Sequence, residues 1–62
     1  MVVGSETFRG TVSGIMAMIA CHKMIGKEMT NLELSDKMDE YLDLIMYPGS
    51  REAVKLAVYK EL

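Results

Sequence analysis

Three small groups of residues in this 62-residue chain are of types that can do chemistry, and the first is the pair Cys21-His22. A cysteine nucleophile needs a base within hydrogen-bonding reach and a further group that orients the base. Neighbouring residues on a helix point about 100° apart, so His22 is poorly placed to take a proton from Cys21. We therefore interpret Cys21 as a small buried apolar residue, with an intersubunit disulfide as the alternative, and place His22 at a helix edge.

Carboxylates form the second group, and its members follow one another at helical spacing: Asp36, Asp39, Glu40 and Asp43. Calcium sites of the EF-hand type take such ligands from a loop that turns at a glycine, whereas a straight helix sets them along one line. We predict no metal site and no cofactor here. The first interpretation is a solvated acidic face, and the second is a docking surface for a basic protein partner, with these four acids as the partner-binding residues.

Ser35 and Asp39 form the third group, one helical turn apart. Residues 35–39 read Ser-Asp-Lys-Met-Asp, and they resemble the Ser-Gln-Glu-Leu-Asp signature of the small sporulation-control aspartyl-phosphate phosphatases. Asp36 and Lys37 stand where that family has Gln and Glu. The resemblance implies a helical hairpin that dephosphorylates a response regulator, with Ser35 and Asp39 as catalytic residues. It supplies an enzymatic alternative to a non-enzymatic protein without catalytic residues.

Three helical segments must position these residues, at about 6–25, 31–46 and 51–61. The middle segment repeats apolar residues at the i, i+4, i+7 spacing of an amphipathic helix. Alanines and a capping serine favour a helix over a strand in the last segment. Residues 1–62 therefore form a single all-α, three-helix domain. The predicted N-caps and stop signals are Ser5, Thr30 with Glu33 as a capping box, Ser50, Gly26, and Pro48-Gly49 as a type II turn.

The first segment carries no charge between Arg9 and His22. A helix that is apolar all round belongs in an interior, and two short helices cannot cover every side of it. Small residues one turn apart also allow two helices to approach closely. We therefore expect the chain to self-associate through this helix, as a homodimer in the first instance. The predicted self-association residues are Gly10, Gly14, Ala17, Cys21 and Met18.

Size, charge and composition narrow the function classes. A domain this small rarely gains more than about 3–5 kcal/mol from its core, and one cysteine and one histidine exclude an intrachain disulfide and a four-ligand zinc site. A net charge of −2 lacks the basic surplus of a nucleic-acid binder. The most apolar stretch, residues 11–21, is shorter than the roughly 20 residues that span a membrane. The absence of an export signal favours the cytoplasm.

These observations predict a small non-enzymatic interaction protein that self-associates through its first helix and binds or inhibits an unidentified protein partner. The phosphatase is the alternative. The second alternative is a small DNA-binding regulator, in which the last two segments form a helix-turn-helix and Arg51, Lys55 and Lys60 supply the bases.

Overall fold

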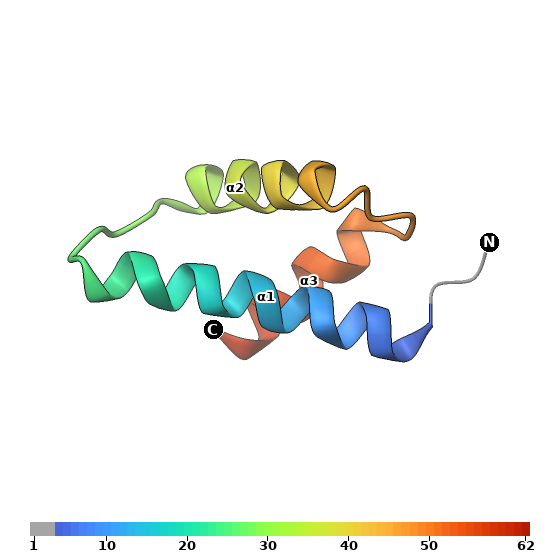
Figure 1. The fold of residues 1–62 in the computed structure, drawn as a ribbon. Coiled ribbons are helices and arrows are strands. Elements are labelled where there is room, and N and C mark those ends of the chain that lie inside the picture. The colour runs from blue at the N-terminus through green and yellow to red at the C-terminus, as the bar shows by residue number, and fades with distance from the viewer. Residues whose placement is uncertain (1–3) are drawn as a thin grey trace.

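The structure is a computed structural model that describes residues 4–62. Over this range the chain forms three α-helices and no strand: α1 (Ser5–Met24), α2 (Asn31–Leu44) and α3 (Arg51–Glu61). The prediction of a small all-helical, three-helix domain is confirmed. In Figure 1, α1 and α2 run along the length of the molecule, and α3 leads from the end of α2 across the middle of α1 and contacts both helices.

The helices begin where hydroxyl side chains satisfy free backbone amides, with one exception. Thr30 accepts a hydrogen bond from the Glu33 amide at 3.2 Å, and Ser50 accepts one from the Ala53 amide at 3.3 Å, as predicted. The predicted cap at Ser5 is wrong. Gly4 is the N-cap of α1 and makes no side-chain cap bond, and Ser5 is the first helical residue.

α1 and α2 both end in a left-handed residue followed by a backbone bond back into the helix, the Schellman arrangement. Gly26 has φ +78° after α1, and the Lys27 amide donates to the His22 carbonyl at 2.9 Å. This confirms Gly26 as the stop signal.

The end of α2 differs from the prediction. α2 stops at Leu44 because Met46 takes φ +53° and the Tyr47 amide donates to the Leu42 carbonyl at 2.9 Å. The reversal turns the Tyr47 side chain into the core, where it is only 9% exposed. Within residues 4–62 the positive-φ residues are Gly26 and Met46. The predicted type II turn is therefore wrong, because it requires a positive φ at Gly49.

The core receives one side chain per helical turn from each helix. Ile15 and Ile19 come from α1, Val54 and Val58 from α3, and the remaining members from α2 and the turn after it: Leu34, Met38, Leu42 and Tyr47. Thr11 continues the buried stripe of α1, and its hydroxyl donates to the Thr7 carbonyl at 2.8 Å. The four-residue spacing within each helix explains why three short helices suffice to enclose this core.

Among the helices of residues 4–62, none has both the length and the apolar character needed to cross a membrane.

Candidate functional site

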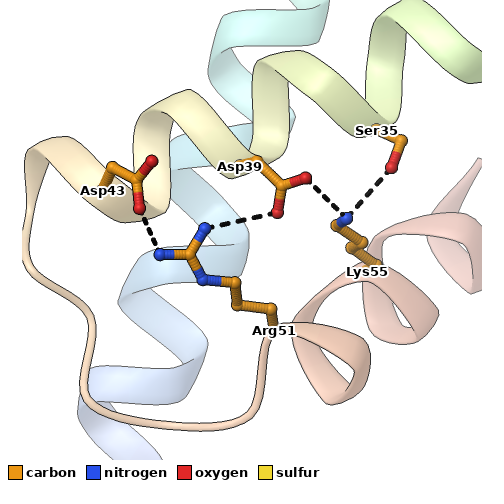
Figure 2. Close-up of polar contacts among 5 residues, drawn as sticks. All are labelled: Ser35, Asp39, Asp43, Arg51 and Lys55. Carbon is orange, nitrogen blue, oxygen red and sulfur yellow. Dashed lines mark hydrogen bonds and ion pairs between the residues drawn. The ribbon is translucent and has the colours of Figure 1, made fainter.

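The polar side chains between α2 and α3 form the main cluster of chemically active groups. α2 presents Ser35, Asp39 and Asp43 at four-residue intervals, and α3 presents Arg51 and Lys55 at the same interval. Residues four apart lie on the same face of a helix, so the two rows face each other. Figure 2 shows that they interdigitate, with Lys55 between Ser35 and Asp39 and Arg51 between Asp39 and Asp43.

Each basic residue bridges two neighbours on α2. Lys55 Nζ donates to Ser35 Oγ and to Asp39 Oδ2, both at 3.0 Å. Arg51 Nη1 lies 3.4 Å from Asp39 Oδ1, and Arg51 Nη2 pairs with Asp43 Oδ1. Both oxygens of Asp39 are therefore engaged by α3. The order of these contacts also requires α3 to run antiparallel to α2.

The cluster lowers the pKa of Asp39 from its usual 3.8, and the largest cause is the hydrogen bond from Lys55. Partial burial of Asp39 raises its pKa in opposition, while the charges of Lys55 and Arg51 and the Arg51 hydrogen bond lower it further. The pKa of Arg51 is raised, first by its hydrogen bond to Asp43. All of these side chains except Lys55 are substantially exposed, and exposed ion pairs contribute little stability each.

This arrangement joins α3 to α2 through both candidate catalytic residues, Ser35 and Asp39. A nucleophilic serine needs a neighbouring group that takes its proton, but Lys55 donates to Ser35 while it pairs with Asp39. Asp39, in turn, has no oxygen without a basic partner. The phosphatase assignment of Ser35 and Asp39 stays a prediction. For it to hold, Lys55 and Arg51 must release Asp39.

The four predicted partner-binding acids divide into two pairs. Asp39 and Asp43 pair with basic side chains of α3, although Asp43 stays exposed, whereas Asp36 and Glu40 are exposed and make no ion pair with α3. Glu40 lies 3.4 Å from Lys37 on its own helix. A basic partner would therefore meet Asp36 and Glu40 first.

The ion pairs between α2 and α3 also bear on the DNA-binding alternative. They occupy Arg51 and Lys55, which are two of the three bases that a DNA-binding α3 would direct at phosphates.

Sequence reasoning did not identify Arg51 and Lys55 as the partners of Ser35 and Asp39. The sequence signal that could have identified this pairing is the four-residue spacing that the polar residues of α2 share with the basic residues of α3. It requires α2 and α3 to be neighbours in antiparallel order, which periodicity alone does not establish.

Cys21 and His22 do not face each other. Cys21 is exposed and forms no disulfide within the described chain, so the prediction that it is buried is wrong. The His22 Nδ1 atom lies 2.8 Å from the Met18 carbonyl of the same helix. Within residues 4–62, no group of three or more histidine, cysteine and acidic side chains is placed to hold a metal ion.

The predicted self-association residues of α1 lie in two environments. Gly14 faces α2, because a Cβ atom added there would lie 2.2 Å from Tyr41 Oη and 3.0 Å from Tyr41 Cζ. Met18 is half-buried and packs against the core. The other three members are exposed: Gly10, Ala17 and Cys21. The small size of Gly14 therefore has a cause within the chain, and the contacts of the exposed members with another copy stay a prediction.

We define the outward face of α1 as the exposed residues Gly10, Ser13, Ala17, Ala20 and Cys21. They lie on the side of the helix opposite buried Ile15 and Ile19.

Comparison of the chain with protein-family models, with curated proteins and with solved structures gives no match.

Proposed function

We propose that this protein is a small non-enzymatic interaction protein that self-associates through the outward face of α1 and binds or inhibits another protein. The observation that carries the proposal is the composition of this face. Five exposed positions of α1 between Arg9 and Lys23 hold only glycine, serine, alanine and cysteine. Exposed helix faces of soluble proteins normally carry charges, and the other two helices follow that rule.

The exposed residues of α2 and α3 differ from those on the outward face of α1. The exposed positions of α2 include Glu33, Asp36 and Glu40, and those of α3 include Glu52 and Lys60. An uncharged face of small side chains suits close approach of a second helix. Pairing two copies would also supply the additional burial that a domain of this size needs. The exposed thiol of Cys21 suits a reducing compartment such as the cytoplasm.

Sedimentation velocity over a range of micromolar concentrations tests self-association. The wild type should sediment as a dimer, and Ala17→Glu should sediment as a monomer, because the new charge would be buried in the interface. Leu32→Glu is the matched control, since it places the same charge on an exposed position of α2, and it should remain dimeric. A wild type that stays monomeric at every concentration would refute self-association.

The second part of the proposal is a basic protein partner for α2. Asp36 and Glu40 offer two exposed carboxylates one turn apart. A native lysate passed over the immobilised chain should yield a protein that the double variant Asp36→Lys/Glu40→Lys does not retain. The double variant Glu52→Lys/Glu61→Lys is the control, because it makes the same charge change on α3. Equal retention by both variants would contradict a docking role for α2.

A further inference from the structure

A groove of about 500 Å³ lies where α1 turns into α2, at one end of the molecule. Its apolar floor is formed by Ile19 of α1, Met29 of the connecting segment and Leu34 of α2. Pockets that bind small molecules have volumes of roughly 300–1,000 Å³ and are mostly apolar, with a few polar groups that orient the ligand. The volume of the groove falls within this range, and its floor is apolar.

Two lysines border the same groove as a result of how α1 ends. Lys23 lies in the last turn of α1, and the left-handed Gly26 folds the chain back so that Lys27 also lines the groove. None of the ion pairs among residues 4–62 involves Lys23 or Lys27. Glu28 is the third charged side chain of the lining, and Leu62 completes the lining beyond the end of α3, so the two lysines outnumber the one acidic side chain.

The N-terminus of α2 adds to this positive potential. Asn31, the first residue of α2, lines the groove. The amides at the start of a helix have no partner within it, and they form the positive end of the helix dipole. Thr30 caps only the Glu33 amide. An anionic group at the mouth would therefore meet two lysines and free backbone donors, directly above an apolar floor.

We propose that this groove binds a medium-chain fatty carboxylate. The alkyl chain lies on Ile19, Met29 and Leu34, and the carboxylate lies at the mouth between Lys23 and Lys27. The floor selects an alkyl chain, and the unpaired lysines select an anionic head group over a neutral one. This binding site goes beyond the proposed interaction function and does not depend on self-association.

Isothermal titration with octanoate, decanoate and dodecanoate below their micellar concentrations tests the proposal. Affinity should rise about fourfold for each methylene added while the chain still fits on the floor. Dodecanol should bind more weakly than dodecanoate. The double variant Lys23→Gln/Lys27→Gln should lose about tenfold in dodecanoate affinity, because it removes the hydrogen bonds to a charged group, and should bind dodecanol as before. Lys37→Gln/Lys60→Gln is the control and should leave both affinities unchanged.

The location is tested separately. Titration with dodecanoate should shift the backbone amide resonances of Lys27 and Asn31, and Met29→Trp should block binding by filling the groove. Circular dichroism of each variant confirms that α1 and α2 are intact. Absence of binding by the wild type would overturn the proposal. So would equal affinity for the acid and the alcohol, or resonance shifts confined to residues outside the groove.

Discussion

The two glycines of α1 allow a matched test of the packing between α1 and α2. Gly10 and Gly14 lie one turn apart within the same helix, and each is replaced by alanine. An added Cβ has nothing within 4 Å at Gly10, but at Gly14 it would lie 2.2 Å from Tyr41 Oη. Alanine within a helix is favoured over glycine by about 1 kcal/mol. Gly10→Ala should therefore stabilise the monomer by about 1 kcal/mol, which raises Tm by roughly 4–8 °C in a domain of this size.

Gly14→Ala brings the same gain in helix propensity but displaces Tyr41. The Tyr41 ring is half-buried and packs against the core. Full burial of a large apolar side chain is worth about 1.5–3 kcal/mol, so partial loss of its contacts costs about 1–2 kcal/mol. Gly14→Ala should therefore be neutral or destabilising by up to about 1 kcal/mol. Tyr41→Phe removes the atom in closest conflict. In that background Gly14→Ala should recover most of its gain.

Urea unfolding followed by circular dichroism, at a protein concentration where the chain is monomeric, measures all four changes. The essential quantity is the coupling free energy between Gly14→Ala and Tyr41→Phe. A Gly14→Ala variant that is stabilised as much as Gly10→Ala would refute the contact between Gly14 and Tyr41. Zero coupling in the double-mutant cycle would refute it as well.

Three further changes test other parts of the fold. Met46→Gly should stabilise the chain by about 0.5–1 kcal/mol in urea unfolding, since Met46 is 84% exposed and its φ of +53° suits glycine; no gain would count against the left-handed end of α2. The pKa of Asp39 lies below its usual 3.8 in the fold, so its stabilising effect is complete above that pH and is lost as the pH falls through the folded-state pKa. The Tm of the wild type should therefore fall more steeply below pH 4 than that of Asp39→Asn, and parallel curves would disprove the link between Asp39 and α3. Met38→Ala should cost about 2–5 kcal/mol, because Met38 is completely buried; it should leave little folded chain by circular dichroism, and a native-like spectrum would contradict a core centred on Met38.

Much of the fold could be predicted from local patterns, because those patterns act within a few residues. The Thr30 and Ser50 caps, the Gly26 stop and the apolar stripe of α2 each depend only on nearby sequence, and each is present in the structure. The end of α2 could not be predicted this way. Met46 adopts a conformation that its residue type disfavours, because tertiary packing draws Tyr47 into the core.

The side-chain cluster between α2 and α3 depends on which helices are neighbours, and this limits what the sequence alone predicts. The spacing of Ser35 and Asp39 resembles a family signature and therefore predicted that they are catalytic residues. The same spacing also allows them to receive Lys55. Gly14 shows the same ambiguity. Its small size was predicted to serve self-association, but the side chain that approaches it in the structure is Tyr41 of the same chain.

Gly10 is different, and it gives the sharpest test of self-association. It lies within α1, where glycine costs about 1 kcal/mol relative to alanine, and nothing within the described chain approaches the position of its missing Cβ. Close approach of a second copy would explain a glycine here. Gly10→Ala should then have opposite effects on two measured quantities: higher monomer stability in urea and weaker dimerisation in sedimentation. If monomer stability rises while the dimer dissociation constant stays unchanged, close packing of two copies at Gly10 is wrong, and the outward face of α1 must meet its partner elsewhere.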